Sequence, residues 1–368
     1  MEKSSEKFSR RSPRRISGLF PVLLAGFLLF ALCGCSLQSD SSSAENTPEE
    51  SATQEVYAMD TYMTLTASGE SANAAVSAAA QKLYELDAEL SATDENSQIY
   101  ALNHRLSDRV SGDAAAVLSA SIRLSALTEH CFDISVYPLV CAWGFPTREY
   151  RIPSEEEIDR LLSHTGMEGI SFDTSSGKVT FADEQMMIDA GAIAKGYASD
   201  AVADIFHSYG ITSGLISLGG NVCAFGSKTD GSDWNIAIQD PSSPSDPNAY
   251  AGIIRCSDAF LITSGSYQRY FTENGKRYCH IIDPSTGYPA DNGLSSVTVV
   301  SSSGTEGDAL STALYVMGLE RASEFWRNCT DLSFEAVFIT QEGKIYVTEG
   351  IADDFESSLS APEIISRS

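Results

Sequence analysis

Apolar residues recur at two spacings along residues 57–347, and together these spacings predict a mixture of strands and helices. Residues 57–66 alternate between apolar and polar positions, as in a half-buried strand. Residues 73–90 instead place apolar side chains three and four positions apart, as on one face of a helix. The same reasoning predicts further helices at 113–129, 155–162, 193–206 and 306–317, and further strands at 215–218, 234–238, 260–263, 266–271, 296–300, 334–340 and 344–347. Because strands and helices do not alternate regularly, the pattern favours the α+β class over a doubly wound sheet.

Turn and capping residues mark several element boundaries. Asn274-Gly275 predicts a tight hairpin turn, and Glu342-Gly343 predicts a second one. Ser154 followed by Glu157 forms a capping box at the start of the helix predicted at 155–162. Thr305 is placed to cap the helix predicted at 306–317.

The first 35 residues read as an export signal. A basic leader is followed by the apolar run 16–32, which closes with Leu32-Cys33-Gly34-Cys35. This ending resembles the lipobox of bacterial lipoproteins, which would make Cys35 the lipidated first residue of the mature chain. An uncleaved anchor helix is the alternative. Both interpretations place the globular part outside the cytoplasmic membrane.

Composition divides the remaining chain into three parts. Residues 36–55 are Ser, Thr, Ala and acidic residues with little to bury, so they predict a solvated tether. Residues 56–358 have the composition of a folded domain, long enough for one globular unit or two closely joined lobes. Residues 359–368 are left as a C-terminal tail.

Net charge restricts the partners. The chain has a formal charge of −26, and removing the leader, with its six basic and two acidic residues, takes it to about −30. Such acidity argues against nucleic acid or an anionic membrane surface as a partner, because both would be repelled. An anionic substrate would need a local cation or a metal. Six cysteines remain after the leader, and their spacing fits no zinc site, so most are expected to be buried small hydrophobic residues.

Residues 277–287 and the helix behind them carry the strongest candidate chemistry. His280 is a possible general base, and Asp283 could orient His280 or replace it. Asp308 and Thr312 lie four positions apart on one helix face, and their oxygens suit Mg²⁺. Taken singly, a histidine satisfied within a strand and a local hydrogen bond within the helix remain alternatives.

Two glycine-rich segments also stand out. Residues 189–196 have the spacing of a P-loop, but Lys195 precedes the second glycine and could not reach phosphates as a Walker lysine does. This segment predicts a turn opening a helix, with N–H groups and Lys195 available to an anion, or glycines needed only for the turn. Gly219-Gly220-Asn221 predicts either a close approach to a ligand or a plain turn.

Taken together, these motifs resemble the ApbE family of FAD:protein FMN transferases from Met59 to about Val347. The matched segments are residues 59–61, 131–145, 189–200, 218–221, 263–267, 280–287 and 308–313. The resemblance implies an α+β, T-fold-related domain that binds FAD and Mg²⁺. It also implies that a Ser or Thr hydroxyl of a partner protein attacks the FMN phosphorus, so that AMP leaves and the flavin stays attached as a phosphoester.

The resemblance also assigns roles to individual residues. It implies that His280 and Asp283 act in catalysis, and that the metal is held by the backbone carbonyl of Ala192 together with Asp308 and Thr312. Three departures from the family pattern are Asp60 in place of a common Gly, Thr93 in place of a frequent aromatic, and Ser311 in place of an occasional Asp. The implied FAD contacts are Met59, Cys131, Phe132, Asp133, Asp189, Lys195 and Ile282.

Two other functions use the same motifs. A Mg²⁺-dependent FAD pyrophosphatase would have water as the attacking group and would release free FMN and AMP. A flavin-binding lipoprotein without catalysis would not need a base beside a metal. For the transferase, the resemblance implies an acceptor in a subunit of a Na⁺-translocating NADH:quinone reductase or a related membrane complex. The enzyme itself would be held by its lipid anchor, with palmitate, on the extracytoplasmic face of the cell membrane.

Overall fold

A largely antiparallel sheet runs through residues 50–367, the part of the chain that the computed structural model describes. Its neighbouring strands are antiparallel except for β14 and β16, which pair in parallel. Within these residues the sheet has nine strands, in the spatial order β1 (Ser51–Ala58), β2 (Thr61–Ser68), β5 (Ser213–Leu218), β6 (Asn221–Gly226), β9 (Ala259–Gly265), β12 (Leu294–Ser301), β13 (Phe334–Thr340), β14 (Ile345–Thr348) and β16 (Glu363–Ile365).

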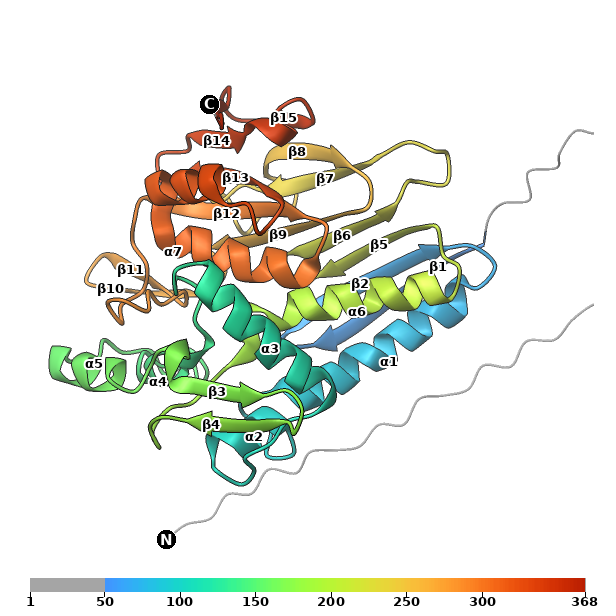
Figure 1. The fold of residues 1–368 in the computed structure, drawn as a ribbon. Coiled ribbons are helices and arrows are strands. Elements are labelled where there is room, and N and C mark those ends of the chain that lie inside the picture. Colours follow the sequence, from blue (N-terminus) through green and yellow to red (C-terminus); the bar gives the residue numbers. More distant parts are fainter. Residues whose placement is uncertain (1–49, 368) are drawn as a thin grey trace, which may run out of the picture. The chain divides into compact units, whose positions relative to one another are not determined.

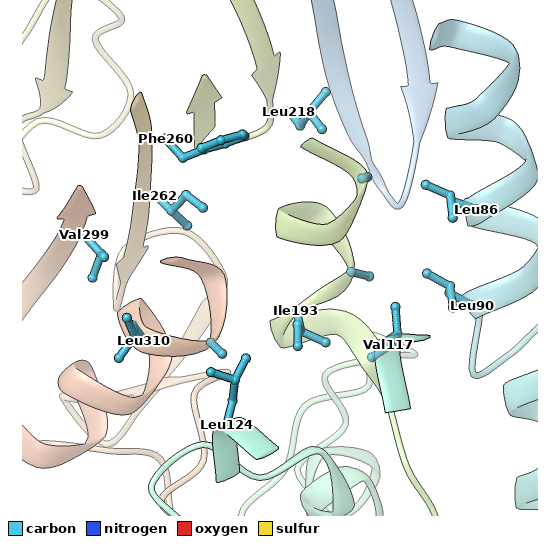
Figure 2. Close-up of a cluster of buried hydrophobic side chains, with 14 of the residues drawn as sticks. Leu86, Leu90, Val117, Leu124, Ile193, Leu218, Phe260, Ile262, Val299 and Leu310 are labelled. Carbon is cyan, nitrogen blue, oxygen red and sulfur yellow. The ribbon is translucent and has the colours of Figure 1, made fainter. Parts of the chain in front are cut away.

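Long helices cover one face of this sheet (Figure 1). Their apolar stripes and the inward side chains of the strands form the main core, part of which is drawn in Figure 2, where Ile193 and Leu310 lie among residues from α1, α3 and the sheet. The helices are α1 (Ala72–Leu90), α2 (Gln98–Asn103), α3 (Gly112–Leu127), α4 (Tyr137–Ala142), α5 (Glu155–Leu162), α6 (Ala194–Ser208) and α7 (Gly304–Asn328).

A smaller sheet covers part of the opposite face. Side chains of one strand alternate between two faces, and in β9 Phe260 and Ile262 belong to the main core while Leu261 belongs to a second buried cluster. That second cluster includes Ile236, Ile254 and Phe355 from the smaller sheet. The smaller sheet has the order β15 (Phe355–Ser357), β8 (Tyr250–Cys256) and β7 (Trp234–Gln239), and two hairpins stand apart as β3 (Ile170–Asp173) with β4 (Lys178–Phe181) and β10 (Tyr270–Glu273) with β11 (Lys276–Cys279).

Most of the predicted elements are confirmed. The α+β class is correct, and residues 50–367 cluster as one unit rather than two lobes. The capping box is present, because Ser154 Oγ accepts a hydrogen bond from the Glu157 N–H at 3.2 Å. The Asn274-Gly275 turn is also present and joins β10 to β11. No helix among residues 50–367 is long and apolar enough to cross a membrane.

Several boundaries differ from the predictions. The tether predicted at 36–55 is wrong over its last residues, because β1 begins at Ser51 and pairs with β2. The predicted tail is also wrong in part, because β16 pairs with β14. The strand predicted at 266–271 begins only at Tyr270. The predicted export signal, Cys35 included, lies outside the described residues.

The N-cap of α7 is Ser303 rather than the predicted Thr305. Ser303 Oγ accepts a hydrogen bond from the Glu306 N–H at 3.3 Å. Thr305 donates its own hydroxyl to Asp200 at 2.6 Å. The sequence offered two hydroxyl residues within three positions, and the choice between them depends on Asp200, which lies about a hundred residues away in the chain.

The cysteines agree only in part with the prediction. All six after the leader are free thiols. Cys131, Cys223 and Cys279 are buried as expected, whereas Cys141 is exposed. Burial raises the pKa of the Cys256 thiol to about 11, so this thiol stays protonated at neutral pH.

Candidate active site

A pocket of about 910 Å³ gathers nearly all of the predicted site residues. Its walls come from the β1–β2 turn, the β5–β6 turn, the segment before α6, strand β7, residues 280–282 and the first turns of α7. The predicted residues that line it are Met59, Cys131, Phe132, Asp133, Asp189, Ala192, Lys195, His280, Ile282, Asp308 and Thr312. Residues far apart in sequence therefore meet in one cavity.

Met59 and Asp60 form a tight turn that the sequence did not predict. Both have positive φ, 50° and 59°, and Ala58 pairs with Thr61 across the hairpin. A two-residue hairpin turn of this kind normally contains Asn or Gly, because other residues rarely adopt a positive φ. The alternation of residues 57–66 predicts one strand, whereas the chain reverses at Met59 and Asp60 and forms two. The turn puts both residues on the wall of the pocket.

The segment 189–196 is a capped turn that enters α6. The Asp189 carboxylate accepts a hydrogen bond from the Gly191 N–H at 3.2 Å, and residues 190–192 form a single 3₁₀ turn. Burial raises the pKa of Asp189. Gly196 lies at the contact between α6 and α7, where a Cβ would come within 2.6 Å of Asp308 Cβ. This glycine is needed for the close approach of two helices, not for turn flexibility.

The α6–α7 contact leaves three oxygens suited to a hard cation. The Gly196 N–H donates to Asp308 Oδ2 at 2.8 Å, instead of to the Ala192 carbonyl four residues earlier. No backbone N–H among residues 50–367 donates to that carbonyl, and none donates to Asp308 Oδ1. The third oxygen, the hydroxyl of Thr312 one turn after Asp308, lies 3.4 Å from Ser264 Oγ. The three oxygens are therefore the Ala192 carbonyl, Asp308 Oδ1 and the Thr312 hydroxyl.

This donor set fits Mg²⁺ and does not fit zinc. Residues 50–367 contain no cluster of three or more His, Cys, Asp or Glu side chains that could hold a metal. A carboxylate, a hydroxyl and a carbonyl instead supply only hard oxygens with a single negative charge. Mg²⁺ commonly takes few protein ligands and completes its shell with water and substrate phosphates.

Asp200 fixes the helix that carries two of these donors, Asp308 and Thr312, a role that no sequence pattern indicates. Its carboxylate accepts hydrogen bonds from the Gly304 and Thr305 N–H groups at 2.6 and 2.8 Å. These groups are orphan donors at the start of α7, where a negative charge also interacts favourably with the helix dipole. Asp200 therefore sets the position of α7 one turn before Asp308.

Two cations line the pocket, one of them unexpected. Lys195 Nζ lies 3.5 Å from the Gly191 carbonyl and forms no salt bridge with any residue of the range 50–367. Arg269, which sequence reasoning missed, lines the same pocket and donates to the Phe145 carbonyl at 3.1 Å. The same lining carries five aspartates, so these two cations provide positive charge for an anion only in the part of the pocket that they line.

His280 is held in a single useful tautomer. Its Nδ1 lies 3.2 Å from the Arg269 carbonyl, which can only accept a hydrogen bond, so Nδ1 carries the proton and Nε2 keeps its lone pair. Burial, followed by the nearby charges of Arg269 and Lys195, lowers the pKa of His280 to about 4. The imidazole is therefore neutral at physiological pH and able to accept a proton.

Asp283 does not take the place expected for it. It is not among the described residues that line the pocket. Its carboxylate accepts hydrogen bonds from the N–H and the hydroxyl of Ser285, at 2.8 and 2.7 Å, and so closes the turn that follows. The partner that orients His280 is the Arg269 carbonyl. In this structure the Asp283 carboxylate therefore closes a turn, and its role as orienting group or alternative base stays a prediction.

The remaining predicted FAD contacts in residues 131–133, and the glycines of the β5–β6 turn, also line the pocket. Cys131, Phe132 and Asp133 line the pocket, but the Asp133 carboxylate is already bonded to the Ser135 N–H and hydroxyl at 2.7 and 2.6 Å. This segment can therefore offer the pocket mainly its backbone. Gly219 and Gly220 have φ of 60° and 102°, so they are needed for the β5–β6 turn and also line the pocket.

Comparisons with known proteins show the family to which this chain is similar. A model of the ApbE family matches residues 59–338. The FAD:protein FMN transferase of Haemophilus influenzae is 35% identical over 245 residues, which cover 66% of this chain and 69% of the relative. The protein of the same name from Vibrio cholerae is 38% identical over 245 residues, or 65% of this chain and 72% of the relative.

The fold also matches a solved structure. Flavin transferase ApbE from Vibrio cholerae superposes with a TM-score of 0.74 at 30% sequence identity. The match covers 83% of this chain and 100% of that chain. The ApbE-like fold expected from the sequence motifs is therefore confirmed.

Proposed function

The chain belongs to the ApbE family, and we propose that it transfers FMN from FAD to a Thr or Ser hydroxyl of an acceptor protein. The observation that carries the proposal is the meeting, in one pocket, of a neutral histidine, two cations and the oxygen set of Ala192, Asp308 and Thr312. A pyrophosphate needs the positive charge, and an attacking hydroxyl needs the base. The names of the curated relatives support the same reaction.

Groups that line this pocket can supply each part of the transfer reaction. The acceptor hydroxyl oxygen forms a bond to the phosphorus of the FMN half, and the bond from that phosphorus to the bridging oxygen breaks. His280 Nε2 takes the hydroxyl proton, and AMP leaves with the bridging oxygen. Lys195 and Arg269 hold the phosphates in place and balance their charge. Asp308, Thr312 and the Ala192 carbonyl would hold Mg²⁺, which when bound neutralises charge on the pyrophosphate.

Two other functions use the same pocket. A FAD pyrophosphatase would have water in place of the acceptor hydroxyl, with the same base and the same metal donors. A flavin carrier without catalysis is disfavoured, because binding alone does not require a histidine fixed with Nε2 free to accept a proton.

A mass measurement separates these functions. The mature protein is incubated with FAD, Mg²⁺ and the flavin-free soluble domain of the Na⁺-translocating NADH:quinone reductase subunit, which we propose as acceptor. Transfer predicts a covalent FMN increment on that domain and release of AMP. Free FMN without an increment supports the pyrophosphatase, and unchanged FAD supports the carrier.

Lys195 provides a test of anion binding. We expect Lys195→Ala to weaken FAD binding by about tenfold to a hundredfold, because one charge-assisted contact contributes about 1.5 to 3 kcal/mol. Binding of riboflavin, which has no phosphate, should change much less. Fluorescence titration of both ligands checks this, with Lys178→Ala, an exposed lysine of β4, as the control. An equal loss for both ligands would show that Lys195 acts through the fold.

The lipid anchor provides a test of location. We propose that the enzyme is held by Cys35 on the extracytoplasmic face of the cell membrane. Cys35→Ser is then expected to shift the protein from the membrane fraction to the soluble fraction, with the thermal midpoint unchanged, because the first buried core residue is Ala52. Detergent partitioning measures this shift. An unchanged membrane fraction would support the anchor-helix alternative.

A further inference from the structure

Strand β7 has an open edge. It is the last strand of the smaller sheet, whose order is β15-β8-β7, and among residues 50–367 it pairs only with β8. An unpaired edge presents a row of N–H and C=O groups to which another extended chain can bind.

The register shows which residues face that edge. The Arg255 N–H donates to the Asp354 carbonyl at 3.0 Å, and the Ser358 N–H donates to the Ala251 carbonyl at 2.9 Å. Backbone groups of alternate residues in a strand point to opposite sides, so Arg255 and Ile253 face β15 rather than β7. Their partners across the ladder are Asn235 and Ala237. The backbone groups of these two residues therefore point to the open edge, and both residues are exposed.

The pocket reaches this strand along its edge. Ile236, Ala237, Ile238 and Gln239 all line it, although alternate side chains belong to opposite faces of the sheet. No residue of β8 lines it within the part of the chain that the structure describes. A cavity that touches consecutive residues of one strand, and none of the strand behind, lies beside the open edge.

The end of β7 is also held firmly. The two N–H groups of the Gln239 side-chain amide are shared among the carbonyls of Ser243, Asp246 and Ala249, which lie 3.2, 3.1 and 2.9 Å from Nε2. These bonds tie the following loop to the strand. The edge is therefore a fixed template beside the pocket.

We propose that the open edge of β7 binds the acceptor protein segment that carries the hydroxyl, as an added antiparallel or parallel strand. The inference rests on the proposed function, which requires a protein chain to enter the same pocket as His280. Backbone pairing at Ala237 aligns such a segment with little demand on its sequence, and alternate side chains of the added strand then project to one side.

Ala237→Pro tests the backbone contact without breaking the sheet. Proline removes the Ala237 N–H and is tolerated on an edge strand where that group faces away from the neighbouring strand. In steady-state transfer to the acceptor domain named above, we expect KM for that domain to rise about tenfold, the effect of one lost hydrogen bond of about 1.4 kcal/mol. The dissociation constant for FAD and the thermal midpoint should stay close to those of the parent. Ala237→Ser keeps the N–H, so its KM for the acceptor domain should rise much less than that of Ala237→Pro.

Hydrogen exchange provides a second readout that does not depend on a variant folding well. The acceptor domain with its target Thr replaced by Val is added to the parent enzyme, and the amide of Ala237 is expected to exchange several-fold more slowly. An unchanged KM in Ala237→Pro would overturn the proposal, as would protection confined to the exposed Tyr57 and Tyr62 of the β1–β2 hairpin. Failure of the proposed function is distinguishable, because the parent enzyme itself would then transfer no FMN.

Discussion

Asp308→Asn is expected to lower the rate of FMN transfer by about 10²-fold or more. Asparagine keeps the size of the side chain, and its carbonyl can still accept the hydrogen bond from the Gly196 N–H, so the contact between α6 and α7 should persist. What is lost is the negative charge that balances Mg²⁺. Metal stabilisation of a phosphoryl transition state contributes several kcal/mol, and each 1.4 kcal/mol or so corresponds to a factor of ten in rate.

The metal dependence distinguishes a ligand from a structural residue. In Asp308→Asn the Mg²⁺ concentration for half-maximal activity should rise, and excess Mg²⁺ should recover part of the rate. Glu306→Gln is the matched control. It also removes a carboxylate from α7, but that carboxylate forms an ion pair with Arg123 at the surface. Its rate and Mg²⁺ dependence should stay within about twofold, as is usual for an exposed pair. Normal rate and normal metal dependence in Asp308→Asn would refute the ligand assignment.

Helical spacing was the most reliable signal in the sequence. The stripe of residues 73–90 predicts α1 to within one residue, because a long amphipathic helix repeats its pattern over many turns. The hairpin between β1 and β2 was missed for a local reason. Met59-Asp60 is not a usual turn pair, and positive φ at both residues is imposed by the surrounding sheet and not by their own preferences.

The site was predictable where its residues lie in local motifs. Asp308 and Thr312 share a helix face by their spacing alone, and both line the pocket. The roles of Arg269, Asp200 and β7 depend on contacts between segments far apart in the chain. Closeness in sequence can also mislead. Asp283 lies three residues after His280, which suggests that the two side chains interact, but the turn directs the Asp283 carboxylate to Ser285.

His280→Ala is expected to slow FMN transfer by about 10² to 10⁴, the usual contribution of a positioned base. Binding of FAD and Mg²⁺ should remain near that of the parent enzyme, since His280 supplies none of the proposed metal oxygens. Asp283→Asn is the matched control. Because its carboxylate closes a turn outside the lining of the pocket, we expect a small loss of thermal stability and a rate within a few-fold of the parent.

The pH dependence provides the sharper test of His280 as the base. A lowered pKa of about 4 means that the imidazole is neutral, and therefore able to accept a proton, at every pH well above 4. In the parent enzyme kcat/KM for transfer should be level from about pH 6 to about pH 8 and should fall only as the pH approaches that pKa. In His280→Ala the rate should instead rise with pH as hydroxide replaces the base, so the defect shrinks toward high pH. If FAD binding collapsed while single-turnover transfer stayed fast and level with pH, His280 would be a binding or packing residue and not the base.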